Sequence, residues 1–418
     1  MVDPVQRDVD VVTGRNGVGG AEAALLNGQP TGLVTQTSGA MLQNAVDMTG
    51  SGTLFVNGIG TVGTPIMLKP GQHVLGGGQA VTIQGAASGA ITSFRVPGMA
   101  ASIAGTDDSQ DVFQIADNTT INGITIMNGR DGVVGDSVTG FTLSNLIIRG
   151  AADDGVDLNG TFSGDITGVS SSFNDALGFE LGVLDNGSIS RNTATFNGSN
   201  GFFMNGMNAG TLDGNTALVN GNTGIHVVNL TGGLVSGNTT DGNSGIGLRA
   251  SNFTGGTISG NTADDNETLG IEVSFLDGGT LQDNVATRNS VGIQVSQYNS
   301  GTVTNNVATG NDFAGFLVVD NGGGLFDGNT ADGNTGDGFT FLNLTGGTVS
   351  NNTASGNGSD GFEIGSFLDG ANPGSWTAGV LENNAATDNT QAGFRVSNRT
   401  GGTAVGNTAT GNADNTLP

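Results

Sequence analysis

The sequence has no cysteine, a single lysine (Lys69) and few aromatic residues, which occupy 5% of its 418 positions. Without cysteine the chain can form no disulfide, no thiolate nucleophile and no cysteine-ligated zinc or iron–sulfur site. Charged residues make up only 11%, and the net charge is −26. Because so anionic a surface repels phosphate backbones, we expect no nucleic-acid partner. No apolar run reaches about 18 residues, so we also expect no transmembrane helix.

Glycine is abundant instead, with 77 residues, and one unit recurs from about residue 120 onward. Ten asparagines open successive copies at steps of 22 or 23 residues, with one step of 32, and a second asparagine follows each after five residues. Ten matches at a fixed offset do not arise from composition alone, and they indicate a solenoid. The predicted structural ladder consists of Asn192, Asn215, Asn238, Asn261, Asn284, Asn306, Asn329, Asn352, Asn384 and Asn407.

Each unit contains three short stretches in which apolar and polar residues alternate, as in Thr257–Ser259 and Ile271–Val273. Such alternation predicts strands, and no stretch of helical period lies between them. Glycine, asparagine and aspartate supply the corners, because they tolerate the left-handed backbone conformation that tight corners require. We therefore predict an all-β chain, a three-faced parallel β-helix with about 23 residues per coil and about 12 or more coils.

The departures from the repeat predict the domain organisation. Residues 1–50 are expected to form an N-terminal cap or arm, residues 51–120 irregular first coils, and residues 121–418 the regular β-helix. The single step of 32 residues places an insertion loop near residues 371–379. This segment contains the only tryptophan, Trp376, whose ring could stack on a sugar or anchor the loop.

Two segments carry a resemblance to a known group of proteins. GTPIMLKPGQHVLGGG, followed by NTTINGITIMNGRDGV, is similar to the region that precedes the regular coils in autotransporter-like surface proteins of bacteria. The whole stretch from about residue 50 to 410 resembles the right-handed parallel β-helix proteins of the pectate-lyase-like superfamily. That resemblance implies a right-handed coil. It leaves function open, because the superfamily includes polysaccharide lyases, hydrolases and epimerases as well as non-catalytic adhesins.

One group of acidic residues stands out on the predicted coils. Asp157 and Glu180 occupy the same outward position 23 residues apart, so their Cα atoms should lie ~5 Å from each other. Asp153, Asp154 and Asp175 come from the corners before these strands, and Arg149 precedes them in sequence. Three interpretations remain open: residues that only build a corner, a Ca²⁺ site made of Asp153, Asp154, Asp157, Asp175 and Glu180, or a catalytic group of Asp157, Glu180 and Arg149.

No full set of acid, base and cation ligands is concentrated on the outward positions. We therefore expect a non-catalytic, secreted or cell-surface bacterial rod with a structural or adhesive role, and possible end-to-end filaments. Its partner would be a polysaccharide, another surface protein or a second copy of the chain, and no cofactor would be required beyond an optional Ca²⁺. The alternative is a polysaccharide-active enzyme, a lyase or a glycoside hydrolase, with its site around Asp153–Glu180.

Overall fold

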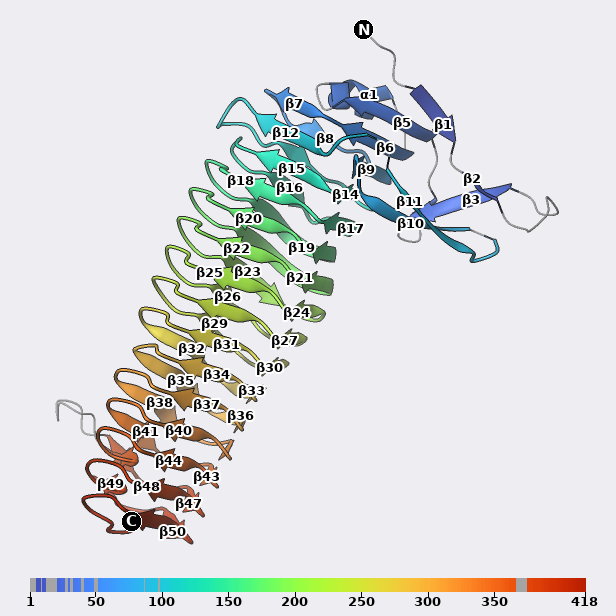
Figure 1. Ribbon diagram of the computed structural model, residues 1–418. Helices are drawn as coiled ribbons and strands as arrows, with labels where there is room; N and C mark the ends of the chain where they lie inside the picture. Colours follow the sequence, from blue (N-terminus) through green and yellow to red (C-terminus); the bar gives the residue numbers. More distant parts are fainter. Residues whose placement is uncertain are drawn as a thin grey trace. The chain divides into compact units, whose positions relative to one another are not determined.

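The computed structural model describes residues 5–8, 10–12, 21–26, 29–30, 33–38, 41–48, 52–85, 87–96, 98–365 and 374–418. It confirms the predicted fold class: a parallel β-solenoid of about 15 turns with about 23 residues per turn. The chain divides into two compact units, Met1–Gly198 and Ser199–Pro418. In each unit, successive coils lie one on another (Figure 1).

In the second unit every coil contributes one strand to each of three files, and strands pair in parallel with their copies in the neighbouring coils. The first file is β24 (Thr211–Asp213), β27 (Leu234–Ser236), β30 (Thr257–Ser259), β33 (Asp277–Gln282), β36 (Ser300–Thr304), β39 (Leu325–Asp327), β43 (Thr348–Ser350), β47 (Val380–Glu382) and β50 (Thr403–Val405). The second is β25 (Thr216–Leu218), β28 (Thr239–Asp241), β31 (Thr262–Asp264), β34 (Val285–Thr287), β37 (Val307–Thr309), β40 (Thr330–Asp332), β44 (Thr353–Ser355), β48 (Ala385–Thr387) and β51 (Thr408–Thr410). The third is β23 (Phe202–Met207), β26 (Ile225–Val227), β29 (Leu248–Ala250), β32 (Leu269–Ser274), β35 (Val291–Tyr298), β38 (Ala314–Asn321), β41 (Asp337–Phe341), β45 (Phe362–Ile364) and β49 (Phe394–Val396).

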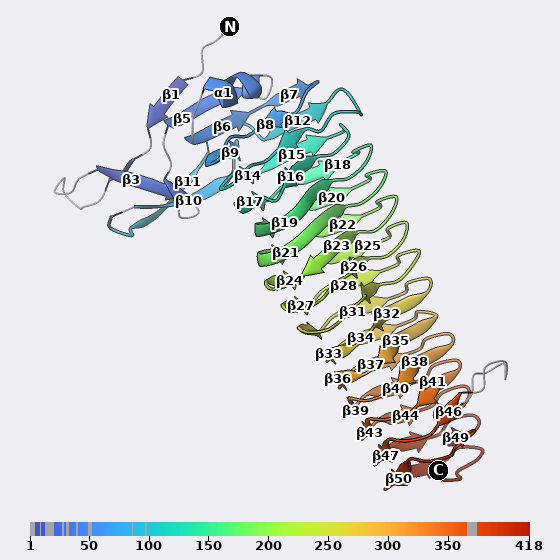
Figure 2. The same ribbon diagram turned by 180° about the vertical axis from the view of Figure 1, so that it is seen from behind.

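The three files are visible from behind in Figure 2. The central residue of each short strand in the first two files points inward, as the alternating pattern predicts. The third file carries larger apolar residues, and four of its phenylalanines form a continuous stack inside the coils. Their ring centroids lie 4.7–4.8 Å apart from Phe316 through Phe339 and Phe362 to Phe394. The repeat thus places identical apolar residues in contact along the solenoid.

The asparagine ladder is confirmed. In the second unit the Asn261 Oδ1 atom accepts the backbone N–H of Asn238 at 3.0 Å and its side-chain N–H at 2.9 Å. The Asn261 amide in turn donates to Asn284 Oδ1 at 2.9 Å and to the Val235 carbonyl at 3.0 Å. These asparagines are about 1% exposed or less. Each rung therefore satisfies buried backbone groups at a corner, where the strand ladder cannot.

The first unit uses the same coil with longer strands. Its third and first files merge where β19 (Val156–Thr167) pairs with β21 (Phe179–Ser190), after β13 (Phe113–Gln114), β14 (Thr120–Asn122), β16 (Val133–Asp136) and β17 (Thr139–Ser144). Its second file is β7 (Ile59–Val62), β12 (Ala101–Gly105), β15 (Ile124–Met127), β18 (Ile147–Arg149), β20 (Ser170–Ser172) and β22 (Thr193–Thr195).

The start of this unit is irregular. Strand β5 (Leu33–Ser38) pairs in parallel with β6 (Gly52–Asn57), and β6 with β9 (Gln72–Gly76), while β8 (Ile66–Met67) pairs with β13. Strands β3 (Ala21–Leu26), β10 (Ala80–Gly85) and β11 (Ile91–Arg95) form an antiparallel sheet. The helix α1 (Leu42–Met48) buries Leu42, Ala45 and Val46, and Lys69 Nζ donates to the carbonyls of Val46 and Asp47 at 3.0 and 2.9 Å. The only lysine thus binds the C-terminal end of the helix.

The insertion expected near residues 371–379 overlaps residues 366–373, which lie outside the described part of the chain. Trp376 lies in β46 (Ser375–Trp376), which pairs with β42 (Asn343–Leu344), and its side chain is fully buried. The Arg399 guanidinium lies 4.2 Å from the centre of the indole ring. Over the described ranges, no helix has the length and apolar character needed to cross a membrane.

Candidate active site

Four carboxylates gather where three consecutive coils of the first unit enter their third-file strands. Asp131 and Asp154 occupy the same corner position two residues before the first apolar residue of β16 and of β19. Asp157 lies in β19, and its register partner in β21 is Glu180. Because paired strands are about 4.8 Å apart, these two half-exposed carboxylates are direct neighbours on the outer surface of the strands.

Backbone hydrogen bonds hold the two corner aspartates in place. The Asp154 N–H donates to Asp131 Oδ1 at 2.8 Å, and the Leu177 N–H donates to Asp154 Oδ1 at 2.7 Å. Both side chains are almost completely buried, with 2% and 3% of their surface exposed. Each aspartate therefore closes the corner of the coil that follows it, as a ladder asparagine would, but with an ionisable group.

One arginine, Arg130, joins this group from the first of the three coils. Its guanidinium contacts Asp111 at 2.8 Å and Asp131 at 3.0 Å. The positive charge also lowers the pKa of Asp157, against the stronger effects of burial and of Glu180. A cation is thus built into one side of the carboxylate group.

Burial and mutual repulsion raise the pKa values of three of the aspartates. Burial, followed by the hydrogen bond to Glu180, raises the pKa of Asp154 to about 8. Burial and then the charge of Glu180 raise the pKa of Asp157 to about 6, although Asn159 donates to Asp157 Oδ1 at 2.9 Å. Burial raises the pKa of Asp131 to about 6, opposed by the Asp154 N–H and by Arg130. At neutral pH, Asp154 is therefore mainly protonated, and it is hydrogen-bonded to Glu180.

Such an arrangement has a defined chemical capacity. A carboxyl group with a pKa near 6 can donate a proton at moderate pH, while a neighbouring carboxylate acts as base or nucleophile. Retaining glycosidases keep their two carboxyl groups about 5–5.5 Å apart, and the strand pairing of Asp157 and Glu180 places their Cα atoms about 5 Å apart. Perturbed carboxyl groups concentrated at one place are typical of functional sites, although structural clusters also produce them.

The structure brings together only part of the predicted set. Asp153, Asp154, Asp157 and Glu180 lie in one group, but the exposed Asp175 is placed in the turn by its N–H, which donates to the Ala151 carbonyl at 3.0 Å. Arg149 lies in β18, in a different file, where its Nη2 atom is 3.3 Å from Met127 Sδ. Trp376 is buried, so its ring has no exposed face for a sugar.

Sequence reasoning missed Asp131 and Arg130, which belong to the coil before the predicted group. A signal for the buried aspartates does exist: Asp-Gly stands before the strand at Asp131, Asp154, Asp337 and Asp360, where other coils have residues such as Leu or Ala. The prediction included the corner residues Asp153, Asp154 and Asp175, but it did not extend the corner position to the preceding coil, where Asp131 occupies it. The pairing of Arg130 has no comparable signal, because it depends on the path of the turn.

Oxygen atoms of these groups could also hold a metal ion. Asp131, Asp153 and Asp154 each offer a carboxylate oxygen within 4.8 Å of the others, a spacing compatible with Ca²⁺–oxygen distances of about 2.3–2.6 Å. In the second unit Asp337, Asp360 and Glu363 meet the same criterion. There, however, Arg395 contacts Asp360 at 2.6 Å and Thr340 donates to Asp337 Oδ2 at 3.1 Å. In this second group an arginine and a hydroxyl thus already bind two of the three carboxyl groups.

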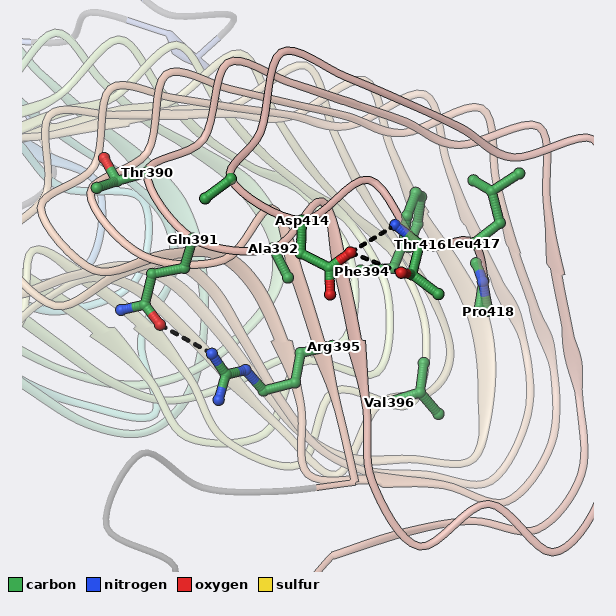
Figure 3. Close-up of a pocket in the computed structure, with 11 residues that line it drawn as sticks. Thr390, Gln391, Ala392, Phe394, Arg395, Val396, Asp414, Thr416, Leu417 and Pro418 are labelled. Carbon is green, nitrogen blue, oxygen red and sulfur yellow. Dashed lines mark hydrogen bonds between the residues drawn. The ribbon is translucent and has the colours of Figure 1, made fainter.

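A hollow of about 710 Å³ lies beside this second group, at the last described coil (Figure 3). Its lining includes Gln391, Phe394, Arg395 and Asp414. Arg395 donates to Gln391 at 2.8 Å, and Asp414 accepts the Thr416 hydroxyl at 2.6 Å (Figure 3). Arg395 also forms an ion pair with Asp360. The polar groups of this hollow are paired with one another, so the group in the first unit remains the stronger candidate.

Comparison with known proteins supports the fold. A family model described as "Right handed beta helix region" matches residues 154–307 and 291–417. No curated protein sequence matches the chain. Similar solved structures include the A-module of the mannuronan C-5 epimerase AlgE6 of Azotobacter vinelandii, at 17% identity and a TM-score of 0.48, covering 89% of this chain and 94% of that one. They also include the periplasmic alginate epimerase AlgG (10% identity, TM-score 0.42, 90% and 85% covered) and the catalytic domain of a GH87 α-1,3-glucanase (11%, 0.40, 89% and 67%).

The comparisons contradict our main expectation of function. We expected a non-catalytic structural or adhesive rod, with filament formation as one version, whereas these similar structures are enzymes named for polysaccharide substrates. The error has a physical origin. We looked for catalytic groups at the outward strand positions and assigned Asp154 only to a corner or a Ca²⁺ site, while the unusual chemistry of the first unit depends on the buried corner residues Asp131 and Asp154.

Proposed function

The chain belongs to the right-handed β-helix family, and from that premise we propose that it is a polysaccharide-active enzyme that cleaves glycosidic bonds by hydrolysis. The observation that carries this proposal is the group of Asp154, Asp157 and Glu180, in which burial and mutual interaction raise two of the carboxyl pKa values. The substrate would lie across β19 and β21, where Asp157 and Glu180 are half-exposed.

Each carboxyl group would have a separate role. Asp157, with its pKa raised to about 6, donates a proton to the leaving oxygen of the glycosidic bond. Glu180 attacks the anomeric carbon as the nucleophile, and water later releases the sugar with Asp157 acting as base. Asp154 is too deeply buried to touch the substrate, and it is a positioning residue that holds Glu180 through the hydrogen bond between their side chains.

The finer parts of this function belong to the same proposal. The enzyme would act outside the cytoplasm, where polysaccharides of cell surfaces and matrices occur. Ca²⁺ is the cation we propose for the oxygen atoms of Asp131, Asp153 and Asp154, because carboxylate oxygens are its preferred ligands; it would bind in place of the proton of Asp154. The acid and nucleophile roles of Asp157 and Glu180 do not require it. A lyase reaction is the competing outcome, and its products differ because they contain a new carbon–carbon double bond.

The test is a screen of neutral and acidic polysaccharides for new reducing ends, performed with Ca²⁺ and with EDTA. We expect cleavage without unsaturated products, and retention of configuration at the anomeric carbon by NMR. Asp157→Asn and Glu180→Gln should each lower kcat by about 10²–10⁴-fold. Unsaturated products would show that the enzyme is a lyase and not a hydrolase. Full activity of both variants would show that Asp157 and Glu180 are not the catalytic residues.

A matched control exists in the second unit. Glu272 occupies the same outward strand position as Glu180, but it forms an ion pair with Arg249 at 3.0 Å. Glu272→Gln removes an equal charge from an equivalent strand, and it should leave activity unchanged. Loss of activity in this variant would indicate that removing a carboxylate lowers activity by disturbing the folded structure and not by removing a catalytic group.

A further inference from the structure

A column of left-handed residues runs along one corner of the coils, directly after the second-file strands. A positive φ there suits glycine, asparagine and aspartate, whereas a bulky side chain in this conformation is an outlier that costs ~1–2 kcal/mol. The column consists of Asn128, Gly150, Phe173 and Phe196 in the first unit and Val219, Gly242, Asp265, Arg288, Gly310, Gly333, Gly356, Asp388 and Gly411 in the second. Bulky residues depart from this pattern at four positions, Phe173 and Phe196 (φ of 56° and 55°) and Val219 and Arg288 (both 53°), and the two phenylalanines stack on each other.

These two phenylalanines do not fill the core. They are 61% and 51% exposed, and their rings stack with centroids 5.1 Å apart and an interplanar angle of 7°. Burial thus gives little compensation for the backbone strain. Strain at exposed residues is a feature of binding and catalytic sites, where the side chain is kept for its contact with a ligand.

The stack ends in a pocket. Phe196 covers Phe173 from the following coil, but the preceding coil has Gly150 at this position and no side chain to continue the column. A cavity of about 300 Å³ lies here, lined by Met127, Asn128, Arg149, Gly150 and Phe173. The missing side chain leaves one face of the Phe173 ring toward the cavity.

The pocket also contains a cation in a strongly anionic chain. Among the described residues Arg149 forms no ion pair, and its Nη2 atom lies 3.3 Å from the weak acceptor Met127 Sδ. Four other arginines, Arg130, Arg249, Arg288 and Arg395, are paired with carboxylates. With a net charge of −26, an arginine left beside an aromatic face favours an anionic ligand.

We infer that the Phe173 pocket binds a sugar ring that carries an anionic substituent, a carboxylate or a sulfate. The apolar face of the ring packs on Phe173, the anion binds the Arg149 guanidinium, and the Asn128 amide is available to a hydroxyl group. This inference rests on the proposed function, from which it takes a polysaccharide as the ligand. It goes further by specifying that the polysaccharide is anionic. Gly150 is four residues before Asp154, so the pocket lies within ~14 Å of the carboxylate group.

The test measures binding separately from turnover. Titration calorimetry of the full chain, carrying Glu180→Gln so that no sugar is consumed, would use a hexauronate, a sulfated hexasaccharide and neutral cellohexaose. We expect one or both anionic probes to bind, and the neutral probe to bind at least about tenfold more weakly. Gly150→Asn should fill the cavity, because a Cβ there approaches only Asn128 Oδ1, at 3.4 Å, and asparagine accepts this backbone conformation.

Gly150→Asn and Arg149→Gln should each weaken anionic binding by at least about tenfold. Phe173→Gly should also weaken it without lowering the melting temperature, because glycine relieves the strain. The control is Gly242→Asn, at the same corner position in the second unit with a φ of 62°, which should bind like the parent. Three results would overturn the inference. They are binding of cellohexaose as tight as that of the anionic probes, no binding of either anionic probe, and unchanged anionic binding in both Gly150→Asn and Arg149→Gln. Hydrolysis of a neutral glycan without anion binding would leave the proposed function intact and remove only the pocket.

Discussion

Replacing Asp154 by asparagine should abolish a specific pH dependence of stability. In the folded chain the pKa of Asp154 is raised from 3.8 to about 8, a difference of roughly 4 units. At 1.36 kcal/mol per unit, this amounts to about 5 kcal/mol. Below pH 4 both folded and unfolded chains hold the proton, and the stability is fully present. As the pH rises to 8, only the folded chain retains the proton, so the free energy of unfolding falls progressively.

Asparagine preserves the shape of the side chain and carries no charge. Its Oδ1 atom can still accept the Leu177 N–H, and its amide can donate to Glu180. We therefore expect Asp154→Asn to gain about 5 kcal/mol relative to the parent chain between pH 4 and pH 8. For 418 residues the entropy of unfolding is roughly 0.9 kcal/mol/K, so the melting temperatures should diverge by about 5–6 °C if the chain unfolds as one unit.

The assay is thermal melting followed by circular dichroism from pH 4 to pH 9, in EDTA so that no cation occupies the carboxylates. Asp283→Asn is the control, because Asp283 is exposed and has a φ of 56° that asparagine also accepts. Its difference from the parent should not change over this pH range by more than ~0.5 kcal/mol. A pH-independent difference between Asp154→Asn and the parent would refute the claim that Asp154 is protonated in the folded chain.

Two further predictions concern the ladder and the reaction. Asn261→Ala should destabilise the chain by about 3–6 kcal/mol in chemical denaturation, because it leaves the Asn238 N–H and the Val235 carbonyl buried without partners; a loss below about 1 kcal/mol would contradict the ladder's role. The value of kcat/KM should fall about tenfold per pH unit above pH 6, since Asp157 must be protonated to act as the acid, and a flat profile from pH 6 to pH 8 would exclude that assignment.

The repeat made the fold and the ladder predictable, because both depend on sequence periodicity alone. Asn238 and Asn261 are 23 residues apart, and one coil per repeat places them in contact whatever the details of the corner. The site depends on those details. Arg149 is only four residues before Asp153, yet it lies in the second file, in strand β18, because the chain turns at the left-handed Gly150 before it reaches the carboxylates. The interior position of Trp376 likewise depends on how the longer coil returns to β46, which periodicity does not determine.

The buried aspartates also say something about what the first unit is for. At the corner position of Asp131 and Asp154, the next coil has Leu177 and a coil of the second unit has Leu269, so the solenoid closes this corner without any charge. A buried carboxyl group costs free energy unless it is protonated or paired, and these two require Arg130, Glu180 and raised pKa values to persist. Since each coil of a solenoid contacts mainly its neighbours, this cost lowers the stability of these coils alone, and the hydrogen bonds of the other coils are unaffected. The second unit keeps the same pair of buried aspartates at Asp337 and Asp360, so this feature alone does not indicate catalysis. What distinguishes the first unit is that Asp154 also binds Glu180, the strand partner of Asp157 in the proposed reaction.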